Sequence, residues 1–176
     1  MKVIFRATDR FLEDVRRDLV RPHPYAAERV GFISVRATTA GDDTLLLLAA
    51  DYFPLEDHEY VDDSTVGAMM GQEAIRKALE IALLRSVGMI HVHLHEHRGR
   101  PHFSRIDVRE QLKFVPDFFK VRREMPHGAI VLSHDRANGR VWLDRNTFVD
   151  ISEFDVMGRR LTIDAAPRDD GLDRLA

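Results

Sequence analysis

Five of the nine histidines in this 176-residue chain lie in the segment HVHLHEHRGRPHFSRID, residues 91–107, which also carries a carboxylate at Asp107. Two histidines at positions i and i+2 of a strand point to the same face, close enough to bind one metal ion. Two imidazoles and one carboxylate are a usual ligand set for catalytic zinc, and they leave a fourth position to a water. The metal lowers the pKa of that water and polarises a bound carbonyl. The segment therefore predicts a hydrolytic metal site.

Alternating histidines also have a plainer interpretation. They can form the solvated face of an edge strand, or a cluster that binds metal only adventitiously, and a lone H-x-H would favour that interpretation. Here the histidines are followed in order by Gly99, Pro101, Ser104 and Asp107. That order makes the metal site the more specific of the two interpretations.

The same order resembles the motif of the JAMM metalloproteases, also called MPN or Mov34/PAD-1 proteins. That motif has an upstream Glu, then H-x-H, a seven-residue loop and S-x-x-D. Residues 104–107 read SRID, and ERVGF supplies Glu28 followed by Gly31 and Phe32. The resemblance implies an α/β fold with a mixed, cytidine-deaminase-like β-sheet flanked by helices. It also implies one Zn²⁺ per chain.

Two histidine pairs are candidates for the H-x-H of this motif. Counting seven residues back from Ser104 places the second histidine at position 96, which is Glu96. His93 and His95 fit with one additional loop residue. The pair that begins at His91 fits the family's G-x-x-H-x-H beginning but needs a loop three residues longer. We expect His93 and His95 to be the H-x-H pair, because one inserted loop residue changes the distance to the Asp107 carboxylate least.

The resemblance assigns a role to each motif residue. The expected zinc ligands are His93, His95 and Asp107, with His91 as the alternative ligand. Glu28 is expected to take a proton from the attacking water and pass it to the leaving amine. Ser104 is expected to donate a hydrogen bond to the developing oxyanion. Their plainer interpretations are a surface Glu at a strand start and the N-cap of the following helix.

The function implied is that of a zinc-dependent isopeptidase or peptidase that removes or processes a ubiquitin-like protein. Its partners would be that protein or its conjugates, together with E1- and E2-like proteins of a bacterial operon, in antiphage defence or sulfur-carrier maturation. One alternative is a non-catalytic MPN scaffold that binds a partner protein. Another is a different H-x-H metal hydrolase, which would need a later ligand such as His127 or His134.

Composition narrows the function classes. The formal charge is -3, and both signs are interspersed, so nucleic acid is not an expected partner. The absence of cysteine excludes thiolate metal sites and disulfides and fits a reducing compartment. No apolar run is long enough for a membrane span, and the first residues do not resemble a signal peptide. We therefore expect a cytoplasmic protein, of unspecified oligomeric state.

The elements that must position these residues follow from hydrophobic periodicity. We expect one domain over residues 1–176, with a frayed tail from about residue 165. Strands are expected at residues 2–5, 28–38, 44–53, 87–94, 128–135 and 139–145, and helices at 8–20, 65–86 and 105–115. The predicted tight turn is at Asn138-Gly139, and the last hairpin joins residues 149–156 to 159–164. The long helix is expected to bury Ile75, Leu79, Ala82 and Leu83.

Overall fold

The computed structural model describes residues 1–41, 43–63 and 67–158, and these form a mixed α/β structure. Its strands are β1 (Lys2–Thr8), β2 (Val30–Thr39), β3 (Thr44–Pro54), β4 (Gly88–Leu94), β5 (His127–Leu132), β6 (Ala137–Trp142), β7 (Phe148–Asp150) and β8 (Glu153–Met157). Its helices are α1 (Asp9–Leu19), α2 (Gln72–Arg85) and α3 (Arg105–Phe118), with the short 3₁₀ helix η1 (Asp57–Glu59). The predicted α/β class is confirmed.

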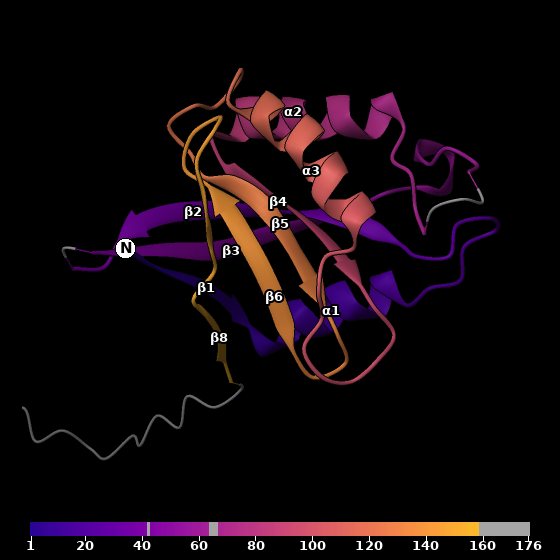
Figure 1. The fold of residues 1–176 in the computed structure, drawn as a ribbon, viewed down its shortest axis with the longest axis horizontal. Helices are drawn as coiled ribbons and strands as arrows, with labels where there is room; N and C mark the ends of the chain where they lie inside the picture. The colour runs from indigo at the N-terminus through magenta and orange to yellow at the C-terminus, as the bar shows by residue number, and fades with distance from the viewer. Residues whose placement is uncertain (42, 64–66, 159–176) are drawn as a thin grey trace, which may run out of the picture.

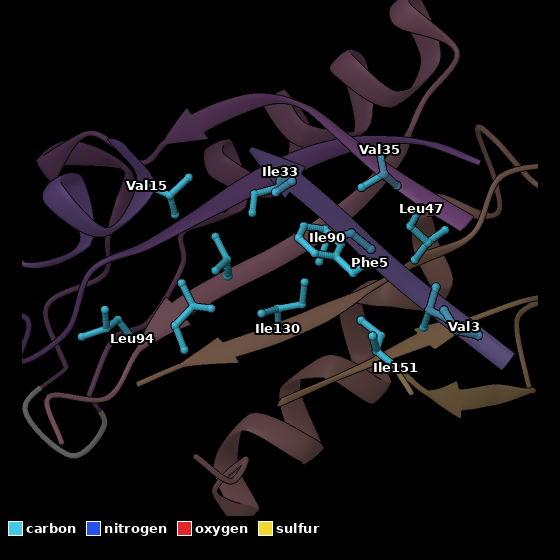
Figure 2. Packing of buried hydrophobic residues seen from close by; sticks show 14 of the residues in the cluster. Val3, Phe5, Val15, Ile33, Val35, Leu47, Ile90, Leu94, Ile130 and Ile151 are labelled. Atoms are coloured by element: carbon cyan, nitrogen blue, oxygen red, sulfur yellow. The ribbon is translucent and has the colours of Figure 1, made fainter. Parts of the chain in front are cut away.

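One sheet contains all eight strands, in the order β7-β6-β5-β4-β2-β3-β1-β8. Helix α1 lies on one face, and α2 and α3 lie together on the other (Figure 1). Figure 2 shows the apolar layer on the α1 face, where Phe5, Ile33, Ile90 and Ile130 come from four strands and pack together. A second core, which includes Phe32 and further aromatic residues, lies beneath α2 and α3. The sheet is therefore covered on both faces, and its central strands are buried.

The two edges of the sheet are joined through residues 151–152. The Ile151 amide donates to the Gly139 carbonyl of β6 at 2.9 Å, and the Ser152 amide donates to the Val3 carbonyl of β1 at 2.8 Å. Strand β7 pairs with β6, whereas β8 pairs in parallel with β1. The prediction of one strand over residues 149–156 is thus wrong, because the chain crosses between opposite edges of a curled sheet. Its predicted partner, residues 159–164, and the tail from residue 165 lie outside the described residues.

The predicted turn at Asn138-Gly139 is also wrong. Both residues lie inside β6, and β5 and β6 are connected by residues 133–136. The Asn138 side chain donates to the Pro101 carbonyl at 3.2 Å. A Cβ on Gly139 would lie 2.8 Å from Ile151 Cδ1 and 2.9 Å from Ile130 Cγ1. The Ala129 carbonyl lies 3.0 Å from the same point, so close packing favours glycine here, and the result is the same Asn-Gly dipeptide that a tight turn prefers.

Helix α2 is shorter than predicted and turned about its axis. It begins at Gln72, because residues 67–71 run back beside η1 instead, with a bridge between Tyr60 and Met70. It buries Ala74, Ala78 and Ala82, whereas Leu83 is 47% exposed. Small alanines at i, i+4 and i+8 let the helix approach the sheet closely, so the larger apolar residues are displaced to the sides of the contact. None of the helices in the described ranges has the length and apolar character needed to cross a bilayer.

Candidate metal site

Strand β4 places two histidines at the centre of the protein. Ile90, Val92 and Leu94 point into the core on the α1 face, so His91 and His93 point to the opposite face, beneath α3. Strand β4 pairs with β2 on one side and β5 on the other. It is a central strand, which excludes the plainer interpretation of these histidines as the solvated face of an edge strand.

Glu28 is brought to this strand by the register of β2. Val30, near Glu28 in the chain, pairs with His93. The backbone amides of Ala27 and Glu28 both donate to the Gly67 carbonyl, at 2.8 and 3.0 Å. Glu28 Oε1 lies 3.9 Å from His95 Nε2. The upstream carboxylate therefore faces the end of β4 and is held there by its own backbone.

Glu28, His93 and His95 form a group that could hold a metal ion, with one ligand atom of each within 4.8 Å of the others. His93 is 1% exposed, and neither ring nitrogen has a hydrogen-bond partner among the described residues. A buried imidazole without partners is costly unless something binds it. A tetrahedral ion with bonds of about 2.0–2.1 Å holds its ligand atoms roughly 3.3 Å apart. The residues present therefore fit a small cation.

Asp107 lies at the other side of His93, at the start of α3. Its Oδ2 is 3.7 Å from His93 Nε2. The same oxygen accepts a hydrogen bond from the Ser104 amide at 2.6 Å, and Ser104 Oγ accepts one from the Asp107 amide at 3.1 Å. Ser104 is thus the N-cap of α3, as its plainer interpretation predicted. An oxygen that accepts one hydrogen bond still has its own proton to donate, so capping leaves the hydroxyl available to a ligand.

Burial changes the proton affinity of the carboxylate and of the imidazoles in this group. Burial, and to a smaller extent the nearby Asp107 carboxylate, raises the pKa of Glu28 to about 7. Burial lowers the pKa of His93 to about 4, against the opposing effect of Asp107. The pKa of His95 is also lowered, chiefly by burial. Both histidines are therefore neutral at pH 7, which is the form that binds metals.

His91, the alternative ligand, lies deeper along the strand. Its ring packs edge-on against Phe32 and Phe114, at centroid distances of 5.7 and 5.4 Å. Burial lowers its pKa to about 3. It is not part of the group formed by Glu28, His93 and His95. Among the described residues, the structure thus brings the pair His93 and His95 to Glu28, and not the pair His91 and His93.

The later histidines are not close to this group. His127 Nδ1 accepts a hydrogen bond from the Met89 amide at 3.1 Å, and Nε2 bonds to the Arg122 carbonyl at 2.8 Å. Both ring nitrogens are occupied by the backbone, so His127 has none left for a metal. His134 is exposed in the loop that follows β5. The expectation that His127 could supply a ligand to a different kind of metal hydrolase is therefore not supported by its position.

A cavity of about 500 Å³ opens over these residues. Its wall includes Glu28, His91, His93, His95, Ser104 and Asp107, with apolar side chains such as Val30, Ile75, Met70 and Phe114. It also includes Gln111 and Gly67, which we did not predict from the sequence. The signal for Gln111 was present, because it follows Asp107 by four residues and so shares its face of α3. Gly67 had no such signal, since its contact with Glu28 depends on the path of a loop.

Comparison with known proteins assigns no family. No family model matches the sequence, and no curated protein matches it. One solved structure that aligns with it is the N-terminal domain of STIL from Trichoplax adhaerens, with a TM-score of 0.37 and 10% identity. The alignment covers 76% of this chain and 39% of that one. A similarity at this level defines neither a shared fold nor an activity.

Proposed function

We propose that this protein is a zinc-dependent peptidase or isopeptidase of the JAMM/MPN type. The observation that carries the proposal is the group formed by Glu28, His93 and His95 at the wall of an open cavity, with Asp107 3.7 Å from His93. These are the carboxylates and imidazoles that the motif requires, contributed by segments far apart in the sequence. The mixed sheet with helices on both faces is of the α/β class that the resemblance implies.

In this proposal His93, His95 and Asp107 hold the ion. Zinc, when bound, would supply a Lewis acid that activates a water and polarises the scissile carbonyl. Glu28 accepts the proton of that water and then donates it to the leaving amine. In the metal-free protein burial raises the pKa of the Glu28 carboxyl, and a bound cation would favour its charged form, which is the form that accepts the proton. The exposed Ser104 hydroxyl donates a hydrogen bond to the oxyanion that develops on the carbonyl.

The proposed substrate is the C-terminal tail of a ubiquitin-like protein, or the isopeptide bond that joins this tail to a lysine. A cavity that is open to solvent accepts an extended chain end, and its apolar wall provides contacts along that chain. E1- and E2-like conjugation proteins are the proposed partners. A scaffold would not need the paired carboxylates and neutral imidazoles to remain together, so we favour the enzyme over the scaffold.

The first test is the zinc content of the purified full chain, measured by elemental analysis. We expect about one zinc per chain in the wild type, and loss of it in His93→Ala, His95→Ala and Asp107→Ala. His97→Ala is the matched control, because His97 is an exposed histidine in the same segment and lies outside the group. Wild-type protein without stoichiometric metal would overturn the proposal.

The second test is cleavage of ubiquitin-like proteins extended at the C-terminus, with and without a chelator. We expect cleavage that is lost on chelation and restored by Zn²⁺. Stoichiometric zinc with no cleavage of any extended tail, or of a lysine-linked conjugate, would favour the scaffold instead.

A further inference from the structure

A second pair of polar side chains lies one step deeper than the metal site. On β4, His91 precedes His93 by two residues, a step of about 6.7 Å along a strand. On α3, Gln111 follows Asp107 by four residues, a step of about 6 Å along a helix. Both members of the deeper pair line the same cavity as the metal site. The strand and the helix thus present two polar pairs in succession.

The deeper pair has three polar atoms without a hydrogen-bond partner in the described part of the chain. Gln111 is 1% exposed, and neither Oε1 nor Nε2 is hydrogen-bonded to any residue that the structure describes. His91 is 8% exposed, and its Nδ1 likewise has no partner among them. Folded proteins leave few buried polar atoms unpaired, because each loses its hydration without a replacement. Two such side chains on one cavity wall indicate a binding function.

The chemistry of this wall favours an uncharged ligand. The glutamine amide offers a donor and an acceptor, and neither carries a charge. Apart from Asp107, which is assigned to the metal site, the acidic residues of α3 that border the cavity are already paired with lysine or arginine. Glu110 binds Arg109 and Lys113, at 3.1 and 2.8 Å, and Asp117 binds Lys120 at 2.6 Å. Glu28 and Asp107 belong to the metal site, so an ion beside Gln111 would have no counter-charge of its own and would be costly, whereas an amide could pair both its N–H and its C=O.

We propose that the inner end of the cavity binds an amide group of the substrate through Gln111 and His91. The group would be either a side-chain carboxamide or a main-chain peptide unit, at about 6–7 Å from the scissile bond, or roughly two residues of extended chain. Val30, Ile75 and Phe114 contact the apolar part that connects the two points. The term substrate rests on the proposed function, but the binding of an amide does not.

The test is a titration of the ¹⁵N-labelled full chain with two small amides. Propionamide represents a side-chain carboxamide, and N-methylacetamide represents a peptide unit. We expect saturable shifts of the Gln111 side-chain amide signals in wild-type protein. The probe that binds more tightly shows whether the site takes a side-chain carboxamide or a main-chain peptide unit. In Gln111→Met and His91→Leu, the affinity followed through backbone signals should fall by about tenfold or more. Gln72→Met is the matched control, because Gln72 is exposed at the start of α2 and should bind as wild type.

The outcomes are distinguishable from those of the metal tests. The inference would be overturned if neither wild-type titration saturated, or if Gln111→Met bound the amides with the same affinity as the wild type. Water would then be the group that pairs with Gln111 and His91. An apolar side chain of similar size relieves the unpaired amide, so Gln111→Met should melt at or above the wild-type temperature. If it unfolds instead, His91→Leu and the wild-type titrations still decide. Amide binding without zinc or cleavage would overturn only the proposed function.

Discussion

Ser104 and Asp107 hydrogen-bond to each other across the first turn of α3, each amide donating to the other's side chain at 2.6 and 3.1 Å. This reciprocal pair is a capping box, and it holds Asp107 Oδ2 at 3.7 Å from His93 Nε2. The S-x-x-D spacing therefore has a structural cause, which is the capping of α3, and a proposed chemical one, which is the roles of Ser104 and Asp107 in the site. The helix start orients the carboxylate that is expected to bind the metal.

Replacing Ser104 by glycine should separate these two causes. Glycine is an acceptable N-cap, so Ser104→Gly should lower the free energy of unfolding by only a few tenths of a kcal/mol. It has no hydroxyl to donate, so we expect kcat to fall by roughly 10²–10³. The measurements are urea denaturation and kcat on an extended ubiquitin-like substrate.

Two further variants at this position complete that comparison. Ser104→Thr keeps the hydroxyl and should retain most of the activity. Ser104→Ala loses the cap and the donor together, and should cost about 1 kcal/mol of stability as well as activity. Full activity in Ser104→Gly would restrict Ser104 to its role as a helix cap.

Glu28→Gln should retain the metal and lose cleavage. The amide keeps the shape of the side chain but can no longer accept a proton, and general acid–base catalysis contributes about 10²–10⁴ in rate. Zinc content and kcat are measured on the same sample. The group of close ligand atoms contains Glu28 and leaves out Asp107, so Glu28 is the alternative candidate for the third ligand. Zinc lost in Glu28→Gln and kept in Asp107→Asn would make Glu28 the third ligand.

The two histidines that flank His93 should behave differently. His95→Leu is expected to lose zinc, because His95 Nε2 faces Glu28 at 3.9 Å. His91→Leu is expected to retain zinc, because its ring is packed against Phe32 and Phe114. Elemental analysis of both variants decides the assignment. Zinc retained in His95→Leu and lost in His91→Leu would instead make His91 and His93 the ligand pair.

His127 should make stability depend on pH. Burial lowers its pKa to about 4 from an ordinary value of 6.5. As the pH falls below 6.5 the unfolded chain takes up a proton there, while the native protein does not until about pH 4. The stability that neutral His127 contributes above pH 6.5 is therefore lost between pH 6.5 and 4, by about 3 kcal/mol in all.

The comparison with His127→Asn isolates this effect from other buried histidines. Both proteins are studied without metal, and unfolding free energies are measured in urea at pH 7 and pH 4.5. His91 and His93 titrate in both proteins, so their contributions cancel in the difference. We expect the stability advantage of the wild type at pH 7 to shrink at pH 4.5. An advantage that is the same at both pH values would show that His127 titrates normally in the native state.

Local pattern was sufficient for much of the scaffold. The alternation in residues 87–94 predicted both the strand and the separation of His91 and His93 from the apolar face, because side chains on a strand alternate by geometry alone. Thr8 caps α1, with its hydroxyl accepting from the Phe11 amide at 3.1 Å, and threonine is a residue type that is common at this position. Such features depend on neighbours in the chain.

Other features depended on which strands become neighbours. Asn138-Gly139 fits a tight turn as well as it fits a crowded strand, and only the approach of Ile130 and Ile151 separates the two. Residues 149–156 read as one strand, since nothing local shows that the sheet curls until its edges meet at residues 151–152.

For the candidate site, the sequence by itself determined the residue types and the short-range order: Glu28, the alternating histidines, and the serine and carboxylate that open α3. Tertiary structure alone decided which of these meet. The pairing of Val30 with His93 brings Glu28 to the end of β4. It leaves His91 one step deeper, on the cavity wall that Gln111 also lines. Spacing along a chain measures distance only within one element. Distances between elements are set by strand pairing and by the packing of α3 on the sheet.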